Sequence, residues 1–124
     1  MADEKTTIAE LKRLVERFVA ERDWQQFHTP KNLSMALAIE AAELMEHFQW
    51  LQPDASRAVA QDPTKRAAVG EELADVVCYA LAMASELGLD LSDALAAKMI
   101  KNATKYPVDV FRGRYGPEDR RPSA

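Results

Sequence analysis

The sequence has few of the residues that build disulfide frameworks, thiolate metal sites or membrane spans. Cys78 is the single cysteine among 124 residues, which excludes an intrachain disulfide and a cysteine-based zinc site. The first residues lack the apolar core of a signal peptide, and no apolar run approaches the roughly 20 residues that a membrane span requires. We therefore expect a soluble, cytoplasmic protein that does not act at a membrane.

An excess of positive charge is also missing. The formal net charge is −4, which argues against a general affinity for nucleic acid. The charge is unevenly distributed, since residues 1–97 carry nine Lys and Arg against seventeen Asp and Glu, whereas residues 98–124 carry seven against three. An acidic body suited to cations thus precedes a basic end suited to anions. This combination suggests a metal-dependent site for a phosphate-bearing ligand.

The periodicity of the apolar residues predicts helices and no convincing strand. Thr7, Thr29–Pro30, Asp62–Pro63 and Ser92 carry the start signals of four main helices, and Gly88 carries a stop signal. The predicted helices span residues 7–22, 30–50, 54–61, 63–87 and 93–105. Short connections between the main helices predict one all-α, four-helix-bundle-like domain over residues 1–107. We expect residues 108–124 to form an irregular or disordered basic tail.

Two acid-x-x-acid pairs, Glu40 with Glu43 and Glu72 with Asp75, lie on the two longest predicted helices. Residues three apart share a helix face, so each pair presents two carboxylates to one neighbour. If the two helices pack face to face, four carboxylates converge and repel one another unless divalent cations lie between them. Oxygen-only ligands select Mg²⁺ or Mn²⁺ over softer metals. The four acidic residues are therefore candidate metal ligands.

Other interpretations account for parts of this pattern. Acid-x-x-acid spacing is common on solvated helix edges, and a non-catalytic helical interaction module would explain the amphipathic helices. A di-iron carboxylate bundle requires Glu-x-x-His pairs, and neither His28 nor His47 has a Glu three residues before it. An interaction module leaves the convergent acids unexplained, and a metal-dependent activity would distinguish an enzyme from such a module.

Two further groups of residues suit a nucleotide. Trp24 and His28 precede the first acidic helix and Trp50 closes it, so their rings suit stacking on a base. On a helix, one polar and mostly basic stripe would comprise Lys98, Lys101, Asn102, Lys105 and Tyr106. Taken alone, such a stripe is typical of a solvated face and a tryptophan is typical of a core anchor. Beside a metal cluster, however, lysines complement the remaining phosphate charge.

The order of these residues resembles the MazG-like all-α nucleoside triphosphate pyrophosphohydrolases. The acidic signature is Glu40-Ala-Ala-Glu43, followed after 28 residues by Glu72-Leu-Ala-Asp75. Four further segments resemble the dCTP pyrophosphatase subgroup: Arg22-Asp-Trp-Gln-Gln-Phe-His28, Pro30-Lys-Asn-Leu33, Phe48-Gln-Trp50 and Lys98-Met-Ile-Lys-Asn-Ala-Thr-Lys-Tyr-Pro107. The similarity covers residues 22–107, most of the chain.

The resemblance implies Mg²⁺-dependent hydrolysis of a nucleoside triphosphate, dCTP or a modified dCTP, to the monophosphate and pyrophosphate in nucleotide house-cleaning. A dUTPase or a phosphoribosyl-ATP pyrophosphohydrolase of the same superfamily is the alternative. The resemblance also implies a homo-oligomer, a dimer or tetramer, in which a basic helix of one subunit could complete the site of another. Residue by residue, it matches the metal-binding and catalytic group to Glu40, Glu43, Glu72 and Asp75, the base pocket to Trp24, His28 and Trp50, and the phosphate or nucleotide contacts to Lys98, Asn102 and Tyr106, with Lys101 and Lys105 beside them.

Overall fold

The computed structural model describes residues 1–116 and 118–120, and over these residues it contains helices and no strand. The elements are α1 (Ile8–Glu21), η1 (Gln25–Phe27), α2 (Pro30–Glu46), α3 (Pro53–Ala58), η2 (Val59–Gln61), α4 (Pro63–Glu86), α5 (Leu91–Lys105) and α6 (Val108–Phe111). The predicted all-α class is confirmed. In the part of the chain that the structure describes, no helix has the length and apolar character needed to cross a membrane.

Three of the predicted start signals act as helix caps. The Thr7 side chain forms a capping box at the start of α1, and the Thr29 side chain accepts a hydrogen bond from a backbone N–H in the first turn of α2. At α4, the Asp62 carboxylate accepts two backbone N–H bonds at once. Pro30 and Pro63 follow their caps at the first helical position, where the missing N–H costs no hydrogen bond. These local signals fix where both acidic helices begin.

The second helix is shorter than the sequence predicted, because α2 ends at Glu46 and not at Trp50. After Glu46 the backbone bonds tighten to a three-residue spacing, as in the bond from the Phe48 N–H to the Met45 carbonyl at 2.9 Å. Pro53 follows closely, and a proline disfavours helical backbone in the residue before it. The chain therefore leaves α2 through a series of turns.

The last long helix begins earlier than predicted. Asp90, and not Ser92, caps α5, which starts at Leu91. The Asp90 carboxylate accepts a hydrogen bond from the Asp93 N–H at 2.8 Å. A carboxylate is a stronger acceptor than a hydroxyl and also complements the positive end of the helix dipole, which favours Asp90 as the cap.

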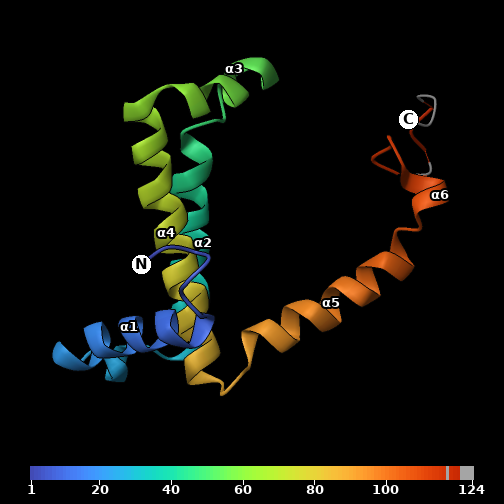
Figure 1. Cartoon of the computed structure of the whole chain (residues 1–124). Helices are drawn as coiled ribbons and strands as arrows, with labels where there is room; N and C mark the ends of the chain where they lie inside the picture. The colour runs from blue at the N-terminus through green and yellow to red at the C-terminus, as the bar shows by residue number, and fades with distance from the viewer. Residues whose placement is uncertain (117, 121–124) are drawn as a thin grey trace. The chain divides into compact units, whose positions relative to one another are not determined.

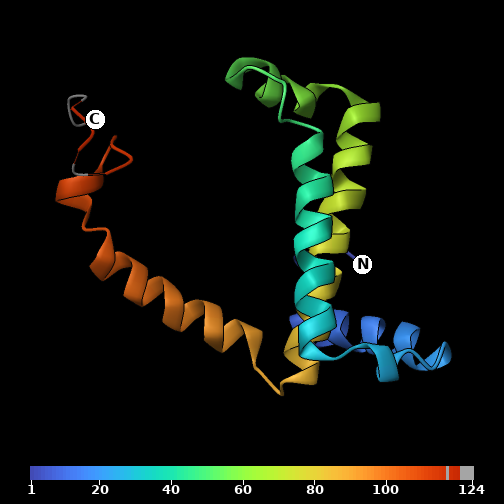
Figure 2. The ribbon, with the colours of Figure 1, turned by 180° about the vertical axis from the view of Figure 1, so that it is seen from behind.

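Residues 1–89 form one compact unit in which α2 and α4 pack along each other over most of their length. The two helices run antiparallel, and α1 packs across α4 near the end of that helix (Figures 1 and 2). Among the residues that the structure describes, the buried apolar side chains lie in this unit: Val19, Leu33, Val59, Leu81, Ala82 and Ala84. The antiparallel pair is the scaffold that brings the two acid-x-x-acid segments together.

The residues from Asp90 onward group into a second unit, which contains α5 and α6. The ring of Tyr106 meets the ring of Phe111 edge-on, with centroids 5.2 Å apart. The helix α6 adds one helical turn inside the segment 108–124 that the sequence analysis expected to be irregular. Residues 117 and 121–124 of that segment lie outside the described residues. The predicted domain boundary at residue 107 stays a prediction.

Candidate metal centre

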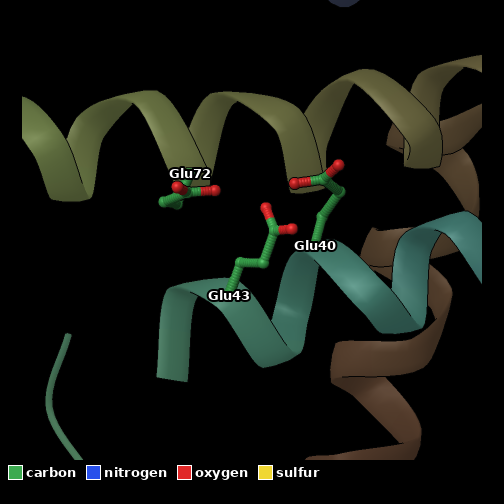
Figure 3. Close-up of side chains that lie close together, drawn as sticks. All are labelled: Glu40, Glu43 and Glu72. Carbon is green, nitrogen blue, oxygen red and sulfur yellow. The ribbon is translucent and has the colours of Figure 1, made fainter. Parts of the chain in front are cut away.

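Three carboxylates converge between the two antiparallel helices. Glu40 and Glu43 project from α2 and Glu72 projects from α4, so that they face one another across the helix pair (Figure 3). One carboxylate oxygen from each lies within 4.8 Å of the others, and all three side chains are half-buried. The i,i+3 spacing on α2 and the packing of α2 against α4 together produce this arrangement.

The electrostatics of the three residues reflect their crowding. Burial, followed by the carboxylates of Glu43, Asp75 and Glu72, raises the pKa of Glu40 above its usual value of 4.5. Burial and Glu43 raise the pKa of Glu72 as well, and the nearby His47 partly opposes that rise. The protein alone therefore disfavours full ionisation of the cluster. A divalent cation would reverse this by favouring the ionised forms.

The donor set fits a hard divalent cation. The Oε2 atom of Glu40 is buried and makes no hydrogen bond, which leaves a carboxylate oxygen free to coordinate. The converging donors are all carboxylate oxygens, the ligand type preferred by Mg²⁺ and Mn²⁺. Burial raises the pKa of the neighbouring Cys78 thiol, with Asp75 and Glu40 adding to the effect.

Asp75, the fourth predicted ligand, stands outside the group of three. It lies one turn beyond Glu72 on α4 and is exposed, and its oxygens are not part of the cluster within 4.8 Å. Its charge nevertheless raises the pKa of both Glu40 and Glu72, which places it in the same electrostatic environment. The structure thus brings three of the four acids together and leaves Asp75 at the edge of the site.

Two residues outside the predicted site lie next to the cluster. The Nε2 atom of His47 is 3.9 Å from Oε1 of Glu72. Burial, together with Glu40, raises the pKa of Tyr79. His47 follows Glu43 by four residues and Tyr79 follows Asp75 by four, so helical spacing was the signal that could have identified both.

The three predicted base-binding residues occupy two separate places. Trp24 contacts Phe18 with ring centroids 5.8 Å apart, and the His28 ring lies 6.5 Å from the Tyr79 ring. Both residues precede α2, whereas Trp50 follows it and is 87% exposed. A helix of 17 residues separates these positions by roughly 25 Å. Within one chain, Trp50 is therefore not brought together with Trp24 and His28.

His28 also lines a cavity of about 230 Å³ between α1, η1 and α4. The remaining lining residues are Val15, Glu16, Val19, Gln25, Ala82, Ser85 and Glu86. The Ser85 hydroxyl oxygen is buried and makes no hydrogen bond. The cavity thus combines apolar walls with several polar groups, as small-molecule sites commonly do.

The predicted phosphate-binding residues lie on and just after α5, in the second unit. Lys98, Lys101 and Lys105 are exposed on the helix, while Asn102 is half-buried. Tyr106 is the C-cap of α5, and the Lys105 ammonium lies 5.3 Å from the centre of its ring. The stripe that the sequence predicted is thus formed on this helix, and its contact with phosphate stays a prediction.

Comparisons with known proteins show which proteins the chain resembles in sequence. It is 45% identical over 107 residues to dCTP pyrophosphatase 1 of Mus musculus, a match that covers 86% of the chain and 63% of that protein. The corresponding protein of Homo sapiens is 42% identical over 106 residues, which cover 86% of the chain and 62% of that protein. The chain therefore spans a little over three fifths of the length of these curated relatives.

A solved structure and a family profile agree with these matches. The crystal structure of a pyrophosphatase from Archaeoglobus fulgidus superposes with a TM-score of 0.71 at 35% sequence identity, and the match covers 81% of this chain and 92% of that one. The profile of the MazG-like family matches residues 35–114, which include all four acids of the two pairs. On this evidence, the chain belongs to the MazG-like family.

Proposed function

We propose that this protein hydrolyses a nucleoside triphosphate, dCTP or a modified dCTP, to the monophosphate and pyrophosphate with Mg²⁺ or Mn²⁺. The observation that carries the proposal is the convergence of Glu40, Glu43 and Glu72 within 4.8 Å, in a chain whose curated relatives are named dCTP pyrophosphatases. The names of those relatives supply the substrate class, and the carboxylate cluster supplies a site for the metal.

The carboxylates of the cluster would bind the cation, and a neighbouring residue would position them. When bound, the cation neutralises charge on the triphosphate and polarises the phosphorus under attack. Glu40, Glu43 and Glu72 would hold it, with Oε2 of Glu40 as a donor that has no competing hydrogen bond. Asp75, exposed at the edge of the cluster, would add a fourth carboxylate to it. His47 would orient Glu72 from behind, as outer partners of ligating carboxylates do.

The nucleoside end of the substrate is proposed to lie toward Trp24 and His28. The His28 cavity combines apolar walls with polar groups, which suits a nucleoside. The His28 ring lies beside the Tyr79 ring, and burial together with Glu40 raises the pKa of Tyr79, so Tyr79 connects the cavity to the carboxylate cluster. If Trp50 also stacks on the base, it must come from a second copy, because α2 separates it from His28 in the same chain. This geometry favours the homo-oligomer, a dimer or tetramer, that the resemblance implies.

The basic stripe on α5 is proposed to contact the phosphates. Lys98, Lys101 and Lys105 would complement the charge that the metal leaves, and Asn102 and Tyr106 would donate hydrogen bonds without adding charge. A role in nucleotide house-cleaning and a cytoplasmic location are part of the same proposal, since free deoxynucleotides are the expected substrate pool.

A substrate panel tests the proposal. Purified protein with Mg²⁺ is incubated with dCTP, 5-methyl-dCTP, dUTP, dTTP and phosphoribosyl-ATP, and released pyrophosphate is measured separately from orthophosphate. We expect pyrophosphate release that is fastest with the cytosine nucleotides and is abolished by EDTA. Preference for dUTP or phosphoribosyl-ATP would assign the protein to the alternative activities. Absence of pyrophosphate release from every triphosphate would overturn the proposal.

A further inference from the structure

A second cavity lies beside the carboxylate cluster, on the side opposite to the His28 cavity. Its volume is about 140 Å³, and it is lined by His47, Leu51, Val59, Lys65 and Val69. These residues come from the end of α2 and the turn after it, from η2, and from the first two turns of α4. We refer to it below as the Lys65 cavity.

The Lys65 cavity has an uncompensated positive charge. Its lining combines two nitrogen-bearing side chains, His47 and Lys65, with three aliphatic ones. Within residues 1–116 and 118–120, no carboxylate pairs with the Lys65 ammonium. Val59 is buried and Val69 is half-buried, whereas Lys65 is exposed, so its ammonium is open to an anion that enters from solvent. The chemistry of the lining therefore favours an anionic group over a neutral one.

The position of the cavity relative to the acids is set by helix geometry. Lys65, Val69 and Glu72 follow one another at spacings of four and three, so they share a face of α4, and Lys65 precedes Glu72 by roughly 10 Å along the axis. His47 bridges the two features, since it lines the cavity and its Nε2 atom lies 3.9 Å from Oε1 of Glu72. An anion in the cavity would thus lie next to the proposed metal position.

The His28 cavity lies in the other direction along α4. Its lining includes Ala82, roughly 15 Å beyond Glu72 along the helix axis. The carboxylate cluster is therefore flanked by one cavity with polar and apolar lining and by another that is cationic. An elongated substrate with a nucleoside at one end and phosphates at the other matches this order.

We propose that the Lys65 cavity is the subsite for the terminal phosphates of the substrate, the group that leaves as pyrophosphate, with Lys65 as the principal contact. This proposal rests on the proposed function, and it fixes the direction in which the nucleotide lies along α4. Lys65 then acts in addition to the basic residues on α5. His47 contributes an N–H donor and keeps Glu72 in place.

Inorganic pyrophosphate is the probe that tests the subsite. In the presence of Mg²⁺, its affinity is measured by titration calorimetry and as product inhibition, for the wild type and for Lys65→Ala. We expect the substitution to weaken pyrophosphate binding by about fivefold or more, because it removes a charge-assisted contact. The KM for the nucleotide should rise while the ratio of rates with dCTP and dUTP stays constant.

Arg66→Ala is the matched control, since it removes the same charge one position further along α4, from a side chain that does not line the cavity. It should change pyrophosphate affinity by less than about twofold, and Lys65→Arg should retain most of the affinity. The fold is not at risk in Lys65→Ala, because the bond to Asp62 uses the Lys65 backbone N–H.

Three results would overturn the subsite. The first is unchanged pyrophosphate affinity in Lys65→Ala, and the second is absence of pyrophosphate binding to the wild type. The third is a changed dCTP to dUTP ratio in Lys65→Ala, which would make the cavity a base site. Calorimetry with pyrophosphate does not require turnover, so the two failures are distinguishable. A wild type that binds pyrophosphate through Lys65 but hydrolyses no triphosphate would refute the proposed function and would leave the Lys65 cavity as a pyrophosphate-binding site without a role in turnover.

Discussion

At Glu40, a half-buried carboxylate faces Glu43 across one helical turn and Glu72 across the helix pair, and its Oε2 atom has no hydrogen-bond partner. These surroundings raise its pKa above the usual 4.5. As the pH rises above 4.5, the unfolded chain ionises at this position before the folded chain does. Without metal, Glu40 therefore lowers the stability of the fold progressively, until the pH exceeds the raised pKa. Below pH 4.5 both states are protonated and the effect vanishes.

Replacement of this residue separates stability from function. We expect Glu40→Gln to raise the unfolding temperature in EDTA at neutral pH, because it removes a repelled charge, and to change it little below pH 4.5. The same variant should lose turnover and most of its stabilisation by Mg²⁺. Binding to the native state alone stabilises the wild type by about 2.7 kcal/mol at a metal concentration a hundred times the Kd. Thermal unfolding across pH, with and without Mg²⁺, measures both effects.

Glu46→Gln is the control for this variant, since Glu46 is an exposed carboxylate on the same helix. Its metal-dependent stabilisation and its turnover should match those of the wild type. Retained turnover in Glu40→Gln would remove this residue from the metal site. A lower unfolding temperature in EDTA at neutral pH would show that Glu40 stabilises the metal-free fold, the opposite of the effect that its raised pKa implies.

The sequence could predict part of this site because helical spacing is a local property. Glu40 and Glu43 had to share a face once α2 formed. Whether Glu72 or Asp75 meets them depends on the register and rotation of α4 against α2, which no local pattern encodes. The structure places Glu72 in the cluster and leaves Asp75 exposed at its edge. The same tertiary register brings His47 to Glu72 and Tyr79 to His28.

At the scale of elements, the start of α4 depends on Asp62. Its Oδ1 atom accepts hydrogen bonds from the backbone N–H groups of Thr64 and Lys65, both at 3.1 Å. We expect Asp62→Ala to lower the free energy of unfolding by about 1 kcal/mol, the usual contribution of an N-cap, because both N–H groups lose their acceptor. Chemical denaturation of the metal-free protein measures the change.

The conservative variant Asp62→Asn tests whether the cap is the cause. Asparagine keeps a side-chain oxygen that can accept the same bonds, so it should restore most of the lost stability. Equal destabilisation by Asn and Ala would show that the negative charge of Asp62, and not its hydrogen bonding, is what stabilises the helix.

Helix starts were more predictable than helix ends. Thr29–Pro30 and Asp62–Pro63 each combine a capping side chain with a proline that fits the first turn, so two independent local preferences agree. The end of α2 carried no such signal, and the chain leaves the helix at Glu46 through tightened turns before Pro53. At α5, Asp90 and Ser92 competed as caps, and the stronger acceptor prevailed.

At the scale of the whole molecule, several large apolar side chains remain uncovered in the first unit. Ile39 on α2 and Leu73 on α4 are 58% and 50% exposed. Exposed apolar surface of this kind commonly marks a protein interface. Trp50 and His28 also lie at opposite ends of α2, so one chain cannot apply both to the same base. Both observations favour an assembly in which copies of the chain share sites.

Shared sites predict complementation between an inactive variant and an impaired one. Glu40→Gln should lack a functional metal centre, and Trp50→Ala should have a raised KM and weakened base selectivity. If a site combines Glu40 of one chain with Trp50 of another, a mixed dimer regains one intact site. After denaturation and refolding of an equal mixture, half of the dimers are hybrids, and each hybrid has one intact site out of two. We therefore expect about a quarter of wild-type activity at low dCTP.

The assembly itself provides the control for this experiment. Introducing Ile39→Asp into both variants places a charge on the exposed apolar face, which should give a smaller particle by light scattering and should prevent the recovery. The presence of hybrids in the mixture is verified by native mass spectrometry. If such mixtures recover no more activity than the mean of the two variants assayed separately, the sharing of Trp50 is contradicted. Trp50 would then act within its own chain and not at the base. Its neighbour Leu51 lines the Lys65 cavity, which is where such a role would lie.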